Sequence, residues 1–151
     1  MEDKQPERTG ESLPQLLLRN QLCFPLYAAA RKVVNAYSPV LKPLGLTYTQ
    51  YIAFLSLWEE GEETVGDMCR SLHLDCGTLT PMLKKMEENG WITRSRSRED
   101  ERVVTVALTQ QGWALRDQVT EVPQKVGSCI RLEPEEAMTL HRILYRLLDQ
   151  E

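Results

Sequence analysis

The chain has 151 residues, a mass of 17.4 kDa and a formal net charge of −4, from 18 lysines and arginines against 22 aspartates and glutamates. Its 42% hydrophobic and 26% charged residues exclude wholesale disorder, and the length fits one ordinary domain with extra arms. A negative total argues against a nucleic-acid-binding protein, whose footprint is normally basic. Net charge describes the whole surface, however, so a basic binding face on an acidic body stays open.

The four cysteines are Cys23, Cys69, Cys76 and Cys129. Residues 1–12 are polar and charged, which predicts a flexible arm rather than a signal peptide, and no stretch of eighteen apolar residues is present. We therefore expect a cytoplasmic protein without membrane contact, in which cysteines are thiols rather than structural disulfides. The absence of a CxxC motif and of ligand-spaced histidines predicts no metal site, and we expect no cofactor.

Residues 22–46 have the pattern of one long helix. Apolar residues recur at steps of four and three from Leu22 onward, and Pro43 and Gly45 end the helix. Pro25 lacks an N–H, so it either lies in the first turn or bends the helix.

Three shorter helices are predicted between residues 47 and 90. Each begins at a side chain that accepts hydrogen bonds from the first helical turn, and these are Thr47, Thr64 and Asp75. Residues 59–63 form an acidic turn between the first two. Pro81 leaves the start of the third helix open between Asp75 and Thr80.

After Gly90 the pattern changes to that of strands. Residues 91–95 and 103–108 are rich in β-branched side chains and flank a charged segment, which predicts a hairpin with a charged tip. Residues 109–129 predict a helix interrupted by proline and glycine, and a terminal helix begins at Glu133 and Pro134. The order of these predicted helices and strands along the chain is typical of a mainly α fold with a small β-hairpin wing, which is a winged helix-turn-helix.

We expect three parts in the chain. Residues 1–12 are the flexible arm, and residues 47–108 are the winged helix-turn-helix DNA-binding domain. Residues 13–46 and 109–151 form a helical dimerisation region, because the first and last helices leave apolar faces that a second copy would cover.

A basic patch lies on the predicted wing. Arg94, Arg96 and Arg98 have no acid among them, a local charge of +3 within a chain of −4. This patch suits phosphates or a minor groove, although a solvated hairpin whose charges keep its edge soluble is an alternative. The carboxylate of Asp100 is close enough in sequence to orient the guanidinium of Arg102.

The helix before the wing favours DNA binding, since its cap, hydroxyls and lysines stand opposite an apolar face. The candidate DNA-binding residues are Asp75, Thr78, Thr80, Lys84, Lys85, Arg94, Arg96, Arg98, Asp100 and Arg102.

These segments resemble a known family. Residues 74–112, LDCGTLTPMLKKMEENGWITRSRSREDERVVTVALTQQG, are similar to the recognition helix and wing of the MarR family of dimeric repressors. QLCFPLYAAAR at 21–31 and LGLTYTQY at 44–51 resemble its branch that senses organic hydroperoxides, the organic hydroperoxide resistance regulators, in their two-cysteine type. The resemblance covers almost everything from Leu22 to Glu151.

The resemblance implies that Cys23 is the redox sensor. It also implies that two tyrosine hydroxyls bond to the sulfur, at the positions of Tyr37 and Tyr48, with Tyr27 nearby. Tyr37 lies fourteen residues along the helix from Cys23, about 21 Å, so it would reach the sulfur from the partner subunit. Without the resemblance, the alternative interpretation is that Cys23 is a small hydrophobic residue buried in the core and that the tyrosines are core aromatic residues.

The other three cysteines have different expectations. The resemblance implies that Cys129, on the stripe of the helix at residues 109–129, is a resolving cysteine, with core packing as the alternative. Cys69 is expected to be structural. Cys76 is small enough to be tolerated at the start of a helix. The alternative is that the helix N-terminus lowers the pKa of its thiol and makes Cys76 a second reactive site.

The implied function is that of a repressor rather than an enzyme. The reduced homodimer binds an inverted-repeat operator in double-stranded DNA until an organic hydroperoxide oxidises Cys23 to a sulfenic acid. That acid condenses with Cys129 of the other chain or with a small thiol, and the helix shifts near Pro25. The alternatives are a MarR-family repressor released by a small phenolic ligand, a single-cysteine oxidant-sensing global regulator and, from another class, a thiol peroxidase.

Overall fold

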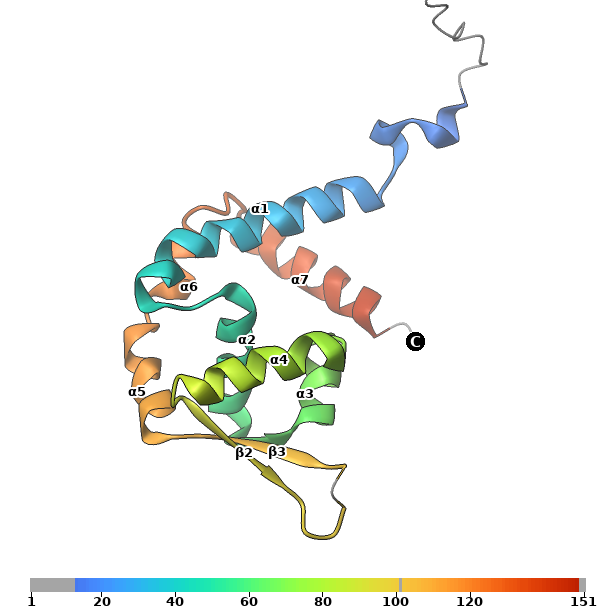
Figure 1. The fold of residues 1–151 in the computed structure, drawn as a ribbon. Coiled ribbons are helices and arrows are strands. Elements are labelled where there is room, and N and C mark those ends of the chain that lie inside the picture. The colour runs from blue at the N-terminus through green and yellow to red at the C-terminus, as the bar shows by residue number, and fades with distance from the viewer. Residues whose placement is uncertain (1–12, 101, 150–151) are drawn as a thin grey trace, which may run out of the picture. The chain divides into compact units, whose positions relative to one another are not determined.

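The computed structural model describes residues 13–100 and 102–149, so the arm predicted for residues 1–12 lies outside the described residues. The helices are α1 (Cys23–Leu41), α2 (Tyr48–Glu60), α3 (Val65–Ser71), α4 (Cys76–Glu88), α5 (Gln110–Gln118), α6 (Val122–Gly127) and α7 (Pro134–Leu148) (Figure 1). The strands are β1 (Glu62–Thr64), β2 (Ile92–Arg96) and β3 (Val104–Leu108). Short 3-10 helices lie at Pro14–Leu16, Leu18–Asn20 and Lys42–Leu44.

The chain divides into two compact units, Met1–Asn35 and Ala36–Glu151. The described part of the first unit consists of two 3-10 turns and most of α1, and it contains no buried side chain. Pro25 lies in the first turn of α1, where the missing N–H costs no intrahelical hydrogen bond. Of the two positions that the sequence left open for Pro25, the structure therefore takes the first turn.

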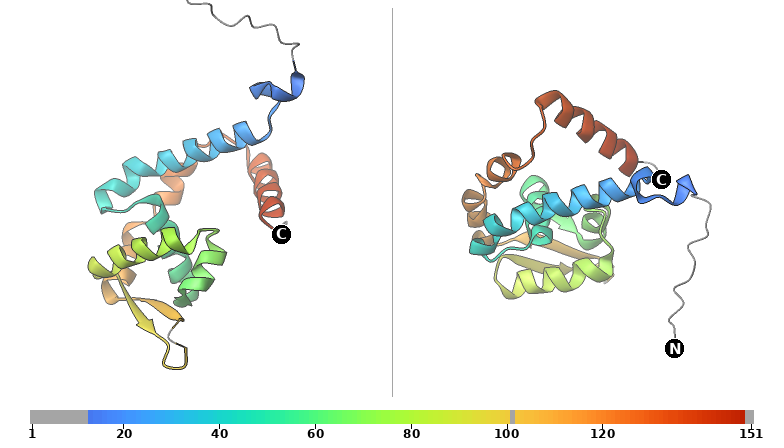
Figure 2. Two further views of the ribbon diagram at one scale, coloured as in Figure 1. Left: turned by 45° about the vertical axis from the view of Figure 1, so that its right-hand side comes forward. Right: turned by 90° about the horizontal axis from the view of Figure 1, so that it is seen from above.

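The second unit contains the winged helix-turn-helix that the sequence predicts, with α3 and α4 as the helix-turn-helix and β2 and β3 as the wing. The hairpin projects beyond the helices in Figure 1 and in the left view of Figure 2. Its strands pair antiparallel, with Arg94 opposite Val106. Part of the predicted acidic turn instead forms β1, which pairs with β3 through Glu63 and Val106, so the sheet has the order β1-β3-β2. The free edge of β3 supplies the backbone partners that make this short glutamate-rich segment extended.

The core of the second unit lies between α2, α3, α4 and the sheet, and it extends to the end of α1 and to α6. Its largest fully buried side chains are Phe54, Leu41, Leu57, Met68, Leu79, Leu83, Met86, Ile92, Val106, Val122 and Val126. Phe54 stacks on Trp58 with ring centroids 5.1 Å apart and meets the edge of Trp91 at 5.7 Å. These aromatic contacts join α2 to the segment that leads into the wing.

The predicted helix starts are confirmed by their caps. Thr47 and Gln50 form the capping box of α2, and the side chain of Thr64 accepts a hydrogen bond at the start of α3. Asp75 caps α4, so this helix begins at the earlier of the two positions left open and Pro81 lies inside it.

The interruption predicted at Pro123 in the helix of residues 109–129 is confirmed, and it divides that region into two separate helices. The structure ends α5 at Gln118 and starts α6 at Val122, with Pro123 in the first turn of α6. Proline favours the first turn of a new helix over the interior of a continuing one. Cys129 consequently lies in the turn after α6 and not on a helical stripe.

Gly112 supports the junction between the wing and α5. A Cβ at this position would lie 2.1 Å from the carbonyl oxygen of Trp91, while the Gly112 carbonyl accepts a hydrogen bond of 3.1 Å from the indole of Trp58. The close approach of two backbones therefore requires glycine here.

We expect Gly112→Ala to lower the free energy of unfolding by about 1–3 kcal/mol, because the added methyl group forces two closely packed backbone segments apart. Chemical denaturation followed by circular dichroism measures this. Gly66→Ala is the control, since a Cβ on Gly66 meets no atom closer than 3.9 Å. Equal stability of the two variants would contradict the packing argument.

Candidate nucleic-acid interface and thiol sites

The outer face of α4 combines a cap, hydroxyls and lysines. The carboxylate of Asp75 accepts hydrogen bonds from the Thr78 N–H at 2.9 Å and the Thr78 hydroxyl at 2.5 Å. These bonds hold the pKa of Asp75 below its usual range, and the bond from the Thr78 hydroxyl has the largest effect. Thr80, Lys84 and Lys85 are exposed on the side opposite the buried stripe. The predicted groups therefore share one solvent-facing surface.

The first wing arginine is committed to an internal ion pair. The Arg94 guanidinium donates to the Glu87 carboxylate at 2.7 and 2.9 Å, and the Arg94 backbone N–H donates to it at 3.0 Å. Hydrogen bonds from the Arg94 side chain, with its backbone bond and positive charge, lower the pKa of Glu87. The local charge of +3 inferred from the sequence is therefore an overestimate, since α4 supplies a carboxylate that neutralises Arg94.

The remaining cations of the wing face solvent. Arg96, Arg98 and Arg102 are exposed along the distal half of the hairpin and its tip. Asp100 does accept a hydrogen bond from Arg102, at 2.9 Å, but the donor is the backbone N–H and not the guanidinium. Asp100 thus shapes the tip, and the Arg102 side chain stays available.

An aromatic cluster brings two of the predicted sensor tyrosines together. The rings of Tyr37 and Tyr48 lie 4.8 Å apart, and those of Tyr37 and Tyr51 lie 5.7 Å apart. Burial, and then the neighbouring Tyr37, raise the pKa of Tyr48 and of Tyr51 above the usual tyrosine value. The hydroxyls of Tyr48 and Tyr51 therefore stay protonated at neutral pH and keep a proton to donate.

Cys23 and Tyr27 belong to the first unit. Cys23 is the first residue of α1 and is an exposed free thiol, unlike the buried small residue of the alternative interpretation. Tyr27 is exposed as well, and Arg31 donates a hydrogen bond of 3.3 Å to its hydroxyl while stacking over its ring. In this chain, the hydroxyl of Tyr27 is engaged with a guanidinium.

Cys129 is the second exposed free thiol. It follows the end of α6, and its sulfur lies 3.6 Å from the carbonyl oxygen of Lys125. The core-packing alternative for Cys129 does not hold within this chain, because the side chain is exposed.

The expectation that all four cysteines are thiols is wrong for one pair. Cys69 and Cys76 form a disulfide, with their Cα atoms 5.7 Å apart. The sequence predicts an inward-facing, structural Cys69 and a free thiol at Cys76, and neither expectation included this bond, although Cys69 is indeed buried. The tight turn between α3 and α4 brings the two together, an approach that helical spacing does not reveal.

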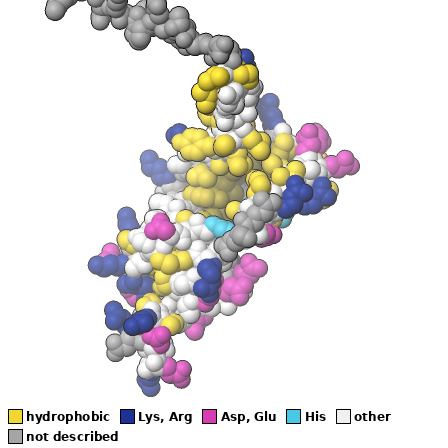
Figure 3. Space-filling view, turned by 90° about the vertical axis from the view of Figure 1, so that its right-hand side faces the viewer, with side chains coloured by type: hydrophobic (Ala, Val, Ile, Leu, Met, Phe, Trp, Pro, Cys, Tyr) yellow, Lys and Arg dark blue, Asp and Glu magenta, His cyan; other side chains and the backbone are white. Residues whose placement is uncertain are grey.

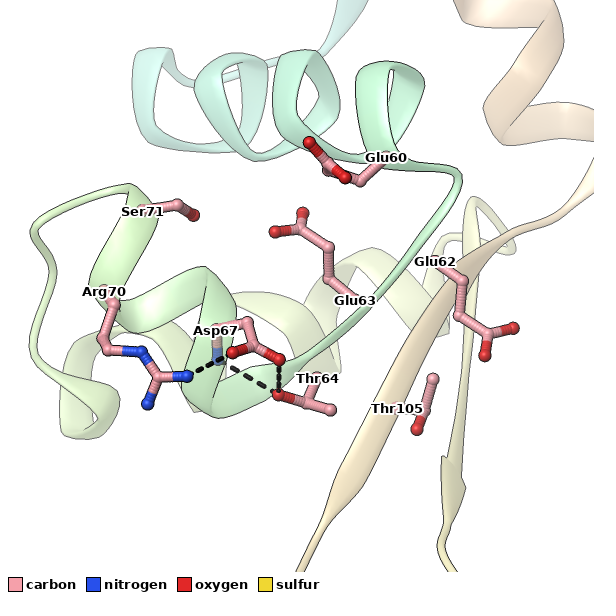
Figure 4. A pocket seen from close by; sticks show the side chains of 8 residues that line it. All are labelled: Glu60, Glu62, Glu63, Thr64, Asp67, Arg70, Ser71 and Thr105. Carbon is pink, nitrogen blue, oxygen red and sulfur yellow. Dashed lines mark hydrogen bonds and ion pairs between the residues drawn. The ribbon is translucent and has the colours of Figure 1, made fainter.

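A pocket of about 510 Å³ lies beside the helix-turn-helix (Figure 4). Acidic and hydroxyl side chains dominate its lining, which consists of Glu60, Glu62, Glu63, Thr64, Asp67, Arg70, Ser71 and Thr105. Its single guanidinium, from Arg70, forms an ion pair with Asp67. Its three glutamates form no ion pair with any residue that the structure describes, so their negative charge makes this pocket unsuited to an anionic ligand.

The described residues contain neither a metal cluster nor a membrane-spanning helix. Between residues 13 and 149, apart from residue 101, no group of three His, Cys, Asp or Glu side chains is placed to hold a metal ion. Within the same residues no helix is both long and apolar enough to cross a membrane.

Residues 35–119 match a known family, described as the transcriptional regulators SarA/Rot. The organic hydroperoxide resistance transcriptional regulator of Bacillus subtilis is 46% identical over 132 residues, 87% of this chain and 90% of that protein. The structure of reduced AbfR bound to DNA has a TM-score of 0.76 and 36% identity, covering 91% of this chain and 94% of that one. The structure of disulfide-formed AbfR has a TM-score of 0.62 and 37% sequence identity, and the match covers 90% of this chain and 96% of that one. The structure of a mutant of Escherichia coli MarR complexed with operator DNA has a TM-score of 0.73 and 27% sequence identity, and the match covers 84% of this chain and 93% of that one.

We expect Glu87→Gln to lower the free energy of unfolding at pH 7 by roughly 0.5–1 kcal/mol, because the half-exposed ion pair with Arg94 is lost. Since the pKa of Glu87 is lowered in the folded state, this contribution is present above the ordinary glutamate range and is lost as the pH falls through the lowered pKa. Urea denaturation at pH 7 and pH 3 measures it, with the exposed neighbour Glu88→Gln as control. A difference of the same size at both pH values would contradict the ion-pair interpretation.

Proposed function

Because the chain belongs to the MarR/SarA family of transcriptional regulators, we propose that it is a homodimeric repressor that binds double-stranded DNA and releases it when an organic hydroperoxide oxidises Cys23. The observation that carries the proposal is the similarity to the Bacillus subtilis hydroperoxide resistance regulator over most of both chains. The sequence similarity to AbfR, which has been solved reduced on DNA and in a disulfide-formed state, supports a thiol-dependent regulator. A regulator of this kind acts in the cytoplasm.

The DNA-binding part of the proposal rests on the outer face of α4 and the wing. In an inverted-repeat operator, the α4 helices of the two subunits enter successive major grooves and present Thr78, Thr80 and the cap residue Asp75 to the bases. Lys84 and Lys85 supply positive charge toward the phosphates. The wings lie along the flanking minor grooves and contribute Arg96, Arg98 and Arg102, as the exposure of these side chains allows.

Arg94 takes a different part in this proposal. Its guanidinium holds the base of the wing against the end of α4 through Glu87. Direct DNA contact is therefore assigned to the distal arginines, and Arg94 positions them.

The dimer is supported by the apolar surface of α7. This helix buries no residue within the described part of the chain, although it carries one apolar stripe. The stripe consists of Leu140, Ile143, Leu147 and Leu148, which are 38–47% exposed. Figure 3 shows hydrophobic side chains gathered on one face with charged ones around them. Exposed apolar surface of this kind favours association with a second copy.

The sensing chemistry starts at the Cys23 thiolate. It attacks the distal oxygen of the hydroperoxide, the alcohol leaves, and Cys23 becomes a sulfenic acid. Condensation with the thiol of Cys129 in the other chain, or with a small thiol, forms a disulfide and releases water. The phenol hydroxyls of Tyr37 and Tyr48 are suited to stabilise the thiolate by donating hydrogen bonds, with Tyr37 reaching it from the partner subunit and Tyr27 lying nearby.

The alternative functions differ in what Cys23 does. A repressor released by a phenolic ligand would respond without it, and a pocket of about 390 Å³ lined in part by Tyr51, Leu55 and Trp58 is large enough for an aromatic ring. A single-cysteine regulator would need Cys23 but not Cys129. A thiol peroxidase would consume hydroperoxide in steady state with a reductant.

We expect Arg102→Ala to weaken binding to a duplex selected by the parent protein from a randomised pool and to reduce the slope of log affinity against log salt by about one. Fluorescence anisotropy at several salt concentrations measures both. Arg116→Ala is the matched control, because Arg116 is exposed on α5, outside the proposed interface. An unchanged slope for Arg102→Ala would remove this residue from the interface.

We expect Cys23→Ser to bind the selected duplex and to keep it after addition of cumene hydroperoxide, whereas the parent releases it. Non-reducing electrophoresis of the treated parent should show a dimer-sized band joined through Cys23 and Cys129, and Cys129→Ser should lack that band. Peroxide-driven release from Cys23→Ser would exclude the thiol mechanism and favour a ligand-released repressor. Release from Cys129→Ser in the absence of other thiols would favour the single-cysteine regulator.

A further inference from the structure

A covalent bond spans the helix-turn-helix itself. Cys69 lies in α3 with 9% of its surface exposed, and Cys76 is the exposed first residue of α4. The bond closes a loop across the turn that contains His73, which adopts a positive φ of 50°. Neither cysteine takes part in the chemistry proposed for Cys23 and Cys129.

We propose that Cys69 and Cys76 form a second thiol–disulfide site, which a small thiol reduces and an organic hydroperoxide oxidises, and whose disulfide form raises the affinity of α4 for DNA. The Cα separation of 5.7 Å lies within the range that a disulfide spans without backbone movement, so the pair opens and closes in place. Disulfides found in reducing compartments are commonly redox-sensing or catalytic rather than permanent.

The difference in exposure decides where exchange takes place. A small thiolate reaches Cys76, the exposed residue of the pair, and forms a mixed disulfide with it, while Cys69 leaves and takes up a proton. A second small thiol attacks the mixed disulfide, which frees Cys76 as a thiol and yields the oxidised disulfide of the small thiol. The two electrons therefore come from two small thiols.

Oxidation starts at the same sulfur. The Cys76 thiolate, at the first position of α4 where the helix N-terminus favours negative charge, attacks the distal oxygen of the hydroperoxide. The alcohol leaves, and Cys76 becomes a sulfenic acid. The thiol of Cys69 then displaces water, which restores the disulfide.

The position of the bond links it to DNA recognition. Cys76 adjoins Asp75, whose carboxylate caps α4 through Thr78, and the first turn of a recognition helix contacts base edges. The disulfide ties this turn to Cys69, a buried residue of α3, which lowers the ordering cost on binding. Backbone hydrogen bonds across the turn, such as Leu74 N–H to the Cys69 carbonyl at 3.0 Å, persist after reduction. Reduction therefore loosens α4 without unfolding it, and its effect on affinity is moderate.

This inference rests on the proposed DNA-binding role but not on Cys23, so its test uses a Cys23→Ser, Cys129→Ser protein that retains only Cys69 and Cys76. The protein is equilibrated with reduced glutathione or with cumene hydroperoxide, alkylated with N-ethylmaleimide and weighed by mass spectrometry. We expect two alkyl groups after glutathione and none after hydroperoxide. The disulfide form should bind the selected duplex about three- to tenfold more tightly and melt about 5–10 °C higher.

The matched control adds Cys69→Ser and Cys76→Ser and should show the same affinity under both treatments. Resistance of the disulfide to several millimolar glutathione would overturn the inference and leave an inert bridge, and so would equal or weaker DNA affinity of the disulfide form. Failure of the parent protein to bind any selected duplex would overturn the proposed function and this inference with it. The first two outcomes would leave the proposed function intact.

Discussion

The burial of one face of α4 is the constraint on which the rest of the structure depends. Leu79, Leu83 and Met86 have no exposed surface, and each stabilises the fold by about 1.5–3 kcal/mol through removal from water. Turning α4 about its axis would expose these side chains and bury Lys84 or Lys85 without a counter-ion, which is far more costly. The core therefore determines which side of α4 meets solvent, and any surface for DNA follows from it.

The wing depends on α4 through a second constraint, which is the alternation of side chains along β2. Ile92 is buried beneath the sheet, so Arg94, two residues on, lies on the same face and close to the helices. A guanidinium in that position needs a counter-ion, and Glu87 at the end of α4 provides one. Arg96 and Arg98 lie further along the hairpin, beyond the helices, and stay exposed. A net charge of −4 is thus compatible with a local basic surface.

The cysteines are distributed over both units of the chain. Cys23 and Cys129 are exposed free thiols, whereas Cys69 and Cys76 are joined across the turn before α4. In our proposals the two pairs have opposite effects on DNA binding, because oxidation of Cys23 releases the DNA whereas the Cys69–Cys76 disulfide raises the affinity of α4 for it. The protein therefore has more than one oxidised form, and the fraction bound to DNA depends on which pair of cysteines has reacted.

The sequence by itself determined the order of α1 to α4 and the two wing strands, and the caps at Thr47, Thr64 and Asp75, because a cap is a contact between residues three apart. The same locality made the winged helix-turn-helix and the exposed lysines of α4 predictable. Only the tertiary structure decided the pairing of β1 with β3, the use of Arg94 as an internal ion and the Cys69–Cys76 bond. These contacts depend on how separate elements meet, and hydrophobic periodicity describes each element alone.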